Sequence, residues 1–408
     1  MASVYKTKNL QGHERPMKHI KFSPDNKHIF SAGADRKVIK WDYKKNIKEY
    51  TYNQNASINV ICISNSGKYM FTGDSTGLIY VWDISINELI KLLKYDLLYN
   101  ISNINISSDD VYLIVTFSQR AKKGNSLVGI FLTEKIITPI QKEDNNQNNN
   151  NYILQIPNPN SDLKSKEEQI PEMFKKIVCT GTNTKFNKSC FTNNNKSILI
   201  SREDGYLEKY DFTTDKLISS NKFHNDIILD LDVNDEYGII LISSKDGEMS
   251  LINLNSFQLI NKFKPENPVR NLNSCQIAII DNPYYIIPGM KQGISIDTLF
   301  DLNTMDITKL RYFENKEDQE KALKFKNKKK IVLAIVAGGQ DSKFVTTTEK
   351  NKGGFEIIIY NAFTGEKLAE FLEHFSPVNT LAVHDNILVS GAEDGSVKIH
   401  EIEHYIFS

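Results

Sequence analysis

The chain has little of what secreted, disulfide-bonded and membrane proteins need. Only four of its 408 residues are cysteines, and none forms a Cys-x-x-Cys pair. Such wide spacing argues against a zinc site and a disulfide framework, so we expect reduced thiols in a cytoplasmic protein. No run approaches 18 consecutive apolar residues, and the N-terminus lacks the apolar core of a secretory signal. We therefore expect no membrane association. The cysteines are Cys62, Cys179, Cys190 and Cys275.

The chain also lacks an excess of charge of either sign. It contains 50 Lys plus Arg and 50 Asp plus Glu residues. A bulk positive field drives non-specific binding to nucleic acid, and a balanced chain does not generate one. We therefore expect no direct, sequence-specific contact with nucleic acid.

The chain has little catalytic apparatus as well. It has no Gly-x-x-x-x-Gly-Lys-Ser/Thr phosphate loop. His400 and His404, with Glu401 and Glu403 between them, have the spacing of His-Glu-x-x-His. On the predicted strand the two histidines would share one face only if the strand is unbroken, and zinc would need further ligands. The pair Gly338-Gly339 has no helix start behind it and indicates a turn rather than a phosphate loop. We expect no catalytic residue, no cofactor and no metal.

What the chain does contain is a repeating polar pattern. It reads Gly12-His13, then Ser31 before a strand-ending glycine, then Asp35 in a turn, then Trp41-Asp42. These are the parts of one four-stranded propeller blade. With Trp41 on the third strand and His13 before the first, the indole, hydroxyl, imidazole and carboxylate can form one hydrogen-bonded tetrad. We therefore predict a structural rather than a catalytic role for these four residues.

The pattern recurs along the chain. A single blade cannot bury both of its faces, so recurrence is required. The second copy closes 41 residues after Trp41, with Thr72 in the serine position and Thr76 where the turn Asp belongs, so its tetrad is incomplete. The seventh copy has the tetrad His374, Ser390, Asp394 and, in the Trp position, His400. The sequence predicts an all-β, seven-bladed WD40 β-propeller, in which the other copies close at Trp82, Phe131, Tyr210, Ile252 and Tyr360.

Two intervals are longer than one repeat and predict insertions into a single domain spanning residues 1–408. Residues 138–171 include an Asn-rich polar tract and are expected to form a mobile loop. Residues 281–330 form a charged insertion before or within blade six, and its Lys-rich part is residues 301–330. A solvated surface helix accounts for its opposite charges at helical spacing, and contact with RNA or an acidic partner is the alternative.

The N-terminal residues are predicted to close the ring. An open propeller would expose a sheet edge, which natural folds avoid. Val4 to Asn9 precede the first blade and have no other assigned role. We expect them to pair as the outer strand of the blade that contains His374 to Ile402.

Six runs of residues resemble a known family, the WD-repeat i subunits of eukaryotic translation initiation factor 3. The most distinctive is Ala337-Gly-Gly-Gln340 followed by Val345-Thr-Thr-Thr348, because it belongs to a blade without the WD signature. His400 in the Trp position also looks like a substitution typical of the family. The remaining runs are Leu10 to Arg15, Gly354 to Glu356, His374 to Asn379 and Gly391 to His400.

The resemblance implies a non-catalytic scaffold subunit of this initiation factor. It would bind the b and g subunits, and through the complex the 40S ribosomal subunit, to support 43S pre-initiation complex assembly and mRNA recruitment and scanning. In the family, a helix near the C-terminus of the b subunit docks around blades five and six. By resemblance, Asp230 and Asp246 would meet basic residues of that helix. Asp246 also occupies a turn-Asp position, so a purely structural role remains open.

Two other classes of function stay open. One is a WD scaffold of another assembly, such as a receptor-kinase-associated adaptor or a ubiquitin-ligase substrate receptor, because fold does not fix function. The other is a propeller enzyme, which would need titratable groups with strongly shifted pKa values converging on the central channel.

Overall fold

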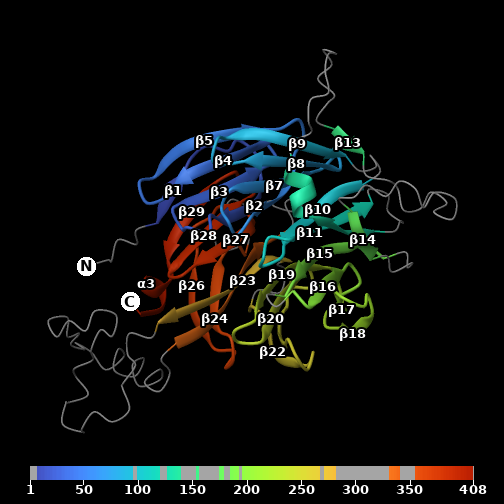
Figure 1. The fold of residues 1–408 in the computed structure, drawn as a ribbon. Coiled ribbons are helices and arrows are strands. Elements are labelled where there is room, and N and C mark those ends of the chain that lie inside the picture. Colours follow the sequence, from blue (N-terminus) through green and yellow to red (C-terminus); the bar gives the residue numbers. More distant parts are fainter. Residues whose placement is uncertain are drawn as a thin grey trace, which may run out of the picture.

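The structure is a computed structural model that describes residues 7–94, 99–119, 126–138, 153–155, 174–178, 184–192, 195–266, 271–281, 330–340 and 354–407. Across these residues the strands form seven sheets arranged in a ring (Figure 1). The first strands of successive sheets contact one another around the centre. The predicted all-β, seven-bladed propeller is confirmed.

Each blade is a meander of antiparallel strands that runs from the innermost strand outward. Blade 1 is β2 (Met17–Phe22), β3 (His28–Gly33), β4 (Lys37–Asp42) and β5 (Ile47–Asn53), and blade 2 is β6 (Ile58–Ile63), β7 (Tyr69–Asp74), β8 (Leu78–Asp83) and β9 (Glu88–Lys94). Blade 3 is β10 (Tyr99–Ile106), β11 (Tyr112–Gln119), β12 (Leu127–Leu132) and β14 (Phe174–Val178), and blade 4 is β15 (Phe186–Phe191), β16 (Ser197–Arg202), β17 (Tyr206–Asp211) and β18 (Leu217–Lys222).

The remaining three blades follow the same plan. Blade 5 is β19 (Ile228–Asn234), β20 (Ile239–Ser244), β21 (Met249–Asn253) and β22 (Leu259–Phe263). Blade 6 is β23 (Asn271–Asp281), β24 (Lys330–Gly339), β25 (Ile357–Asn361) and β26 (Lys367–Phe371). Blade 7 is β27 (Val378–His384), β28 (Ile387–Ala392), β29 (Val397–Glu401) and β1 (Lys8–Leu10).

The hydrophobic core lies between blades rather than inside any one of them. Among the described residues there are seven buried apolar clusters, and each draws its side chains chiefly from two neighbouring blades. Alternating residues of a strand point to opposite faces of its sheet, so each blade supplies both neighbouring clusters. A blade is therefore stable only in the ring.

The N-terminal strand closes the ring as predicted. β1 pairs antiparallel with β29, with Leu10 opposite Val397 and Lys8 opposite Ile399. Leu10 is 2% exposed. The closing strand is thus described over Lys8–Leu10, and residues 4–6 of the predicted segment lie outside the described part of the chain.

A short C-terminal helix, α3 (Ile402–Phe407), reinforces this closure. The ring of Tyr405 stacks on Phe371 of blade 6 at a centroid distance of 4.0 Å. The hydroxyl of Tyr405 lies 3.2 Å from Thr7 Oγ1, just before β1. Since β29 ends at Glu401, the strand does not continue to His404, and the side chain of His404 lies outside the described set.

The two insertions are described only in part. After β12, helix α1 (Thr133–Ile137) leads into the Asn-rich segment, and β13 (Ile153–Gln155) pairs in parallel with β9 as a fifth strand of blade 2, which the sequence did not predict. The rest of residues 138–171 lies outside the description, apart from Thr138. Residues 282–329 and Val345–Thr348 lie outside it too. Gly338 and Gly339 do not form the predicted turn but end β24, where a side chain on Gly338 would overlap the Asn271 carbonyl.

Candidate functional site

The tetrad of blade 1 forms as the sequence predicts. Trp41 Nε1 donates to Ser31 Oγ at 2.7 Å, and His13 Nε2 lies 2.8 Å from the same oxygen. His13 Nδ1 is 3.0 Å from both carboxylate oxygens of Asp35. Burial opposes ionisation of Asp35, but the hydrogen bond and charge of His13 together with the backbone N–H groups of Glu14 and Lys37 outweigh it and lower the pKa of the carboxyl. The four groups bond one another, which is a structural role.

The tetrad of blade 7 differs from the prediction at one position. His374 Nε2 lies 2.7 Å from Ser390 Oγ, which lies 2.8 Å from His400 Nε2. However, His374 Nδ1 meets Ser396 Oγ at 3.0 Å, and Ser396 in turn donates to Asp394 at 2.6 Å. Asp394 therefore supports the network through Ser396 and not by direct contact with the imidazole. A serine two residues after the turn Asp was the missed signal.

Blade 2 uses an amide where other blades use histidine. Gln54 donates to Thr72 Oγ1, and Trp82 Nε1 donates to the same hydroxyl at 3.4 Å. The turn carboxylate is Asp74, which accepts the backbone N–H and the hydroxyl of Thr76 at 2.8 Å each. Thr76 thus binds the turn Asp instead of replacing it.

Blade 4 replaces the tetrad with a charged network. Arg202 donates to Asp204 at 2.5 and 2.9 Å and to Glu208 at 2.6 Å. Tyr210, in the Trp position, donates its hydroxyl to the other oxygen of Glu208 at 2.8 Å. The sequence located Tyr210 as the closing residue of its copy, but nothing in the repeat pattern pointed to Arg202 or Glu208.

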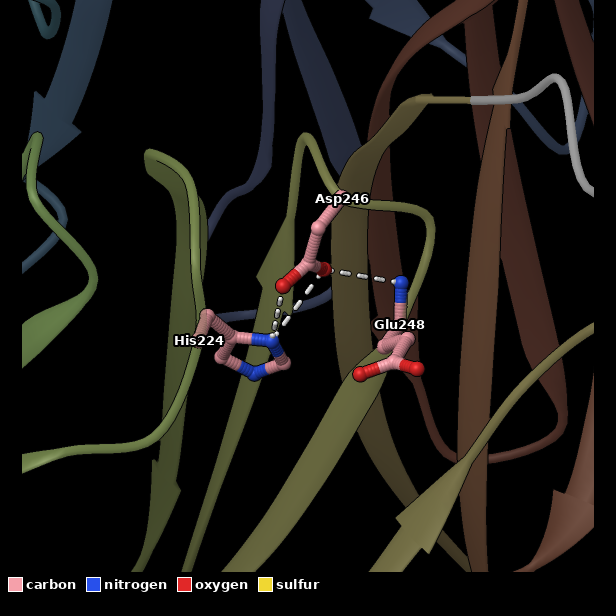
Figure 2. Close-up of side chains that lie close together, drawn as sticks. All are labelled: His224, Asp246 and Glu248. Carbon is pink, nitrogen blue, oxygen red and sulfur yellow. Dashed lines mark hydrogen bonds and ion pairs between the residues drawn. The ribbon is translucent and has the colours of Figure 1, made fainter.

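In blade 5 the carboxylate of Asp246 faces His224 (Figure 2). His224 Nδ1 lies 3.1–3.2 Å from the two oxygens of Asp246, and His224 Nε2 lies 3.0 Å from Ser250 Oγ on β21. Backbone N–H groups of Asn225 and Glu248 donate to the same carboxylate at 3.1 Å. Asp246 thus occupies the structural turn position that the sequence left open, and its role in partner binding stays a prediction.

His224, Asp246 and Glu248 bring possible metal ligands within 4.8 Å of one another (Figure 2). Their atoms already have other partners, because both imidazole nitrogens are hydrogen-bonded and Glu248 forms ion pairs with Lys262 and, at 3.5 Å, with Lys264. A metal at this point would have to displace the contacts that hold blade 5 together. The cluster is better explained as part of the tetrad.

Side chains on the inner strands connect every blade to the next. At each of the seven junctions, a side chain of one inner strand hydrogen-bonds the backbone of the neighbouring inner strand, which occupies polar groups on otherwise unpaired edges. In order from the blade 1–2 junction to the blade 7–1 junction, the side chains are His19, Asn59, Asn103, Asn187, Asp230 with Asp232, Asn273 and Asn379.

Asp230 lies in this ring of contacts, on β19. Its carboxylate accepts from Ser274 Oγ at 2.6 Å and from the Cys275 N–H at 3.2 Å, both on blade 6, and its other oxygen lies 3.2 Å from Lys188 Nζ of blade 4. One carboxylate therefore joins three consecutive blades. The structure does not bring Asp230 and Asp246 into one cluster, since Asp230 lines the central channel and Asp246 sits in the β20–β21 turn.

The channel is a cavity of about 410 Å³ bordered by all seven inner strands. Besides the thiols of Cys62 and Cys190, two groups with strongly shifted pKa values line it. Burial lowers the pKa of His19 well below its usual value, and burial raises the pKa of Asp232 to about 6. His19 Nδ1 accepts the Ile61 N–H, and the Asp232 oxygens accept from the Val233 and Ile277 N–H groups. The channel thus contains shifted groups of the kind that a propeller enzyme would need, and the same groups hydrogen-bond the neighbouring inner strands.

The three described cysteines are free thiols, as predicted, and Cys179 lies outside the described residues. Burial raises the pKa of Cys62 and of Cys190 to about 12, and it raises the pKa of Cys275 as well. The thiolate is the reactive form of cysteine, so these three thiols are poor nucleophiles at neutral pH.

The turn carboxylate of blade 5 makes a prediction for acid stability. Burial opposes its ionisation, but the hydrogen bonds from His224 and the backbone hold the pKa of Asp246 at about 2, below the 3.8 of an ordinary aspartate. Its stabilising effect is therefore fully present above about pH 4 and is lost as the pH falls through 2. We expect Asp246→Asn to lower the unfolding free energy at pH 7 and to flatten its decline below pH 4 in urea titrations. If the unfolding free energy of the variant fell as steeply below pH 4 as that of the wild type, Asp246 would not be the group responsible for the acid sensitivity.

Comparison with known proteins agrees with this geometry. The family model for the WD domain, G-beta repeat, matches residues 4–42, 45–83 and 365–401. Each range covers the inner three strands of blade 1, 2 or 7 and the outer strand that precedes them in the chain. The chain is 23% identical over 396 residues to eukaryotic translation initiation factor 3 subunit I of Schizosaccharomyces pombe, covering 96% of this chain and 94% of the relative. The protein of the same name from Aspergillus oryzae is 24% identical over 97% of this chain and 93% of its own length.

The chain is similar over nearly its whole length to proteins named subunit I of this initiation factor. A further subunit I, from Saccharomyces cerevisiae, is 22% identical over 405 residues, covering 98% of this chain and 93% of that relative. The family resemblance predicted from the sequence is thus confirmed over nearly the whole chain. Within the described part of the chain, no helix is both long and apolar enough to span a membrane.

Proposed function

We propose that this chain is a non-catalytic scaffold subunit of eukaryotic translation initiation factor 3 that acts in the cytoplasm. It binds the b and g subunits and, through the complex, the 40S ribosomal subunit, and it thereby supports 43S pre-initiation complex assembly and mRNA recruitment and scanning. The observation that supports this function best is similarity over 96% or more of the chain to proteins named subunit I of that factor.

The geometry is suited to a scaffold. Seven inter-blade cores and a continuous ring of inner-strand contacts fix the blades relative to one another. A rigid surface loses little conformational freedom when a partner binds, so more of the contact energy appears as affinity. The polar networks of the described blades bond mainly to themselves, and this leaves recognition to loops and strand edges.

Native purification tests the proposed function. The chain, tagged at its own locus, is isolated from cytosol, and the co-purifying proteins are identified and quantified by mass spectrometry. We expect the b and g subunits in near-equal amounts with the tagged chain, together with other subunits of the factor. Recovery of a different WD-scaffold assembly without any subunit of initiation factor 3 would overturn the proposal.

Asp230 and Asp246 remain our proposed contacts for a basic helix of the b subunit. The side chain of Asp230 is 13% exposed and that of Asp246 is 16% exposed. Each carboxylate would have to share its charge with the internal partner, Lys188 or His224. Contact with a basic helix is therefore expected to use the exposed part of each group.

Charge reversal at both positions tests these contacts. For desolvated pairs we expect Asp230→Lys with Asp246→Lys to weaken binding of a peptide from the C-terminal end of the b subunit by about 2–5 kcal/mol in calorimetry. Asp394→Lys is the matched control, because Asp394 is an exposed turn Asp on blade 7. The circular dichroism spectrum must stay native, since both carboxylates also hold the fold together. Wild-type affinity in the folded double variant would eliminate this site without affecting the proposed function.

A further inference from the structure

The outer edge of blade 4 is one of the least protected sheet edges in the described part of the propeller. Exposed edge strands can pair with another chain, and proteins guard them with charged residues. Among the outer strands with described side chains that end a sheet, β1 carries Lys8, β5 carries Lys48 and Glu49, β22 carries Lys262, and β26 carries Lys367 and Glu370. β18 reads Leu-Ile-Ser-Ser-Asn-Lys and has a single charge, Lys222, at its end.

Two apolar side chains stand exposed at the start of this strand. Leu217 is 51% exposed and Ile218 is 52% exposed. Leu217 lies opposite Tyr210, just as Lys48 lies opposite Trp41 in blade 1, and a register shift follows at both places. Blade 4 therefore has Leu-Ile where blade 1 has the Lys48-Glu49 pair. Blade 5 has a similar pair at this register position, Leu259 and Ile260, which are 48% and 39% exposed, but Lys262 follows that pair within β22. The pair on blade 4 has no charged residue after it before Lys222, which points to a contact outside this chain.

Blade 2 shows how an outer edge of this propeller accepts an additional strand. β13 lies parallel to β9, with Ile153 opposite Leu92 and Gln155 opposite Lys94. The first paired residue of β9, Leu92, lies opposite Tyr80, which is two positions before Trp82. In blade 4 the residue two positions before Tyr210 is Glu208, and it lies opposite Ser220. The stretch that corresponds to Leu92–Lys94 is therefore Ser220 to Lys222.

That stretch is open in the described structure. No described strand pairs with the outer side of β18, and Ser220 and Asn221 are half-buried while Lys222 is exposed. On β22, by contrast, Lys262 forms an ion pair with Glu248 and also donates to the Phe223 carbonyl at 3.4 Å. The edge of β22 therefore carries a charged side chain within the strand. Blade 4 thus offers backbone hydrogen-bonding groups, an apolar pair at one end and a cation at the other.

We propose that the outer edge of β18 binds an extended segment of a partner polypeptide as a fifth strand of blade 4. The segment runs parallel to β18, as β13 does to β9, and pairs with Ser220 to Lys222. Its apolar residues rest on Leu217 and Ile218, and an acidic residue near its C-terminal end meets Lys222. Backbone pairing supplies the affinity in this mode, and side chains at alternate positions supply the selectivity.

Amide hydrogen exchange on the intact assembly tests this site. The chain is measured free and again in the assembly purified through its tag. Alternate N–H groups of Ser219 to Lys222 face outward, because the others bond to β17. We expect these outward amides to exchange rapidly in the free chain and at least about tenfold more slowly in the assembly, where they become hydrogen-bonded. Slow exchange already in the free chain, or equal rates in both states, would overturn the proposal.

A matched pair of variants makes the test specific. Leu217→Lys with Ile218→Glu gives blade 4 the pair that blade 1 already carries at this position, so the variant is expected to fold. The assembly purified with this variant should lose the slow amide exchange at β18 and the partner protein that causes it. Leu259→Lys with Ile260→Glu makes the same change on β22 and should keep both. The variant could lose the partner protein although the β18 amides exchange at the same rate in the free wild-type chain and in its assembly. That result would indicate a helix that contacts Leu217 and Ile218 and would refute strand pairing.

The result can be separated from the test of function. Protection of β18 in an assembly without initiation factor 3 subunits would leave this inference standing and refute the proposed function. Unprotected β18 amides in an assembly that contains those subunits would do the reverse.

Discussion

Trp41→Ala is expected to lower the unfolding free energy by about 3–5 kcal/mol, the usual cost of removing a large aromatic side chain from a core. Trp41 is 2% exposed and packs in the cluster shared by blades 1 and 7. Its indole N–H also donates to the buried Ser31, so truncation leaves a cavity and removes one of the two bonds to that hydroxyl. Urea unfolding followed by the fluorescence of the remaining tryptophan, Trp82, measures the change.

Trp41→Phe separates the two contributions. It keeps most of the aromatic volume and removes the N–H, so we expect it to lower the unfolding free energy by about 1–2 kcal/mol. A Trp41→Ala variant within 1 kcal/mol of wild type would mean that the blade 1 tetrad does not stabilise the ring. If Trp41→Phe were as damaging as Trp41→Ala, the hydrogen bond rather than the packing would dominate.

Much of the fold could be predicted because the blade pattern is local and repetitive. The spacing from His13 to Trp41 fixes which residue ends each strand, and the tetrad follows from pairing each polar group. The same logic located the closing strand, since a ring with an open edge is unfavourable. Both the tetrad and the closing strand could be predicted because they lie within or directly before the blade repeat in the sequence, and the geometry of that repeat is known.

The sequence failed where one blade uses a different polar residue for the same purpose. Ser396 stands between His374 and Asp394, and Gln54 takes the place of a histidine in blade 2. In blade 4 the partners of Tyr210 are Glu208 and, beyond it, Arg202. A degenerate repeat fixes backbone positions more strongly than side-chain identity, so the networks had to be observed.

The ring of inner-strand contacts was also beyond the sequence. Its members are separated by roughly one blade each, and they include asparagine, histidine and aspartate in no regular order. Asp230 illustrates the consequence. The family resemblance suggested it as a partner contact, whereas its carboxylate joins blades 4, 5 and 6. A binding variant at Asp230 therefore requires a stability measurement beside it.

Removal of residues 1–10 is expected to destabilise the ring more than any single substitution outside the core. The deletion removes the three β1–β29 residue pairs, the buried Leu10 and the contact between Thr7 and Tyr405. Loss of a buried leucine costs about 2–5 kcal/mol, and each lost backbone hydrogen bond adds about 0.5–1.5 kcal/mol. We expect the unfolding free energy to fall by at least about 4 kcal/mol. Exposure of β29 should also promote association between chains, visible by size-exclusion chromatography with light scattering.

Two substitutions in the full-length chain divide this effect. Leu10→Ala keeps the strand and removes only its buried side chain, so it should reproduce the leucine part of the loss without association. Thr7→Ala removes the hydroxyl that faces Tyr405 and should cost about 1 kcal/mol or less, because that contact is only partly buried. If the shortened chain stays monomeric and unfolds at the same urea concentration as the full-length chain, β1 does not hold the ring closed. The remaining closure would then have to come from α3, through the stacking of Tyr405 on Phe371.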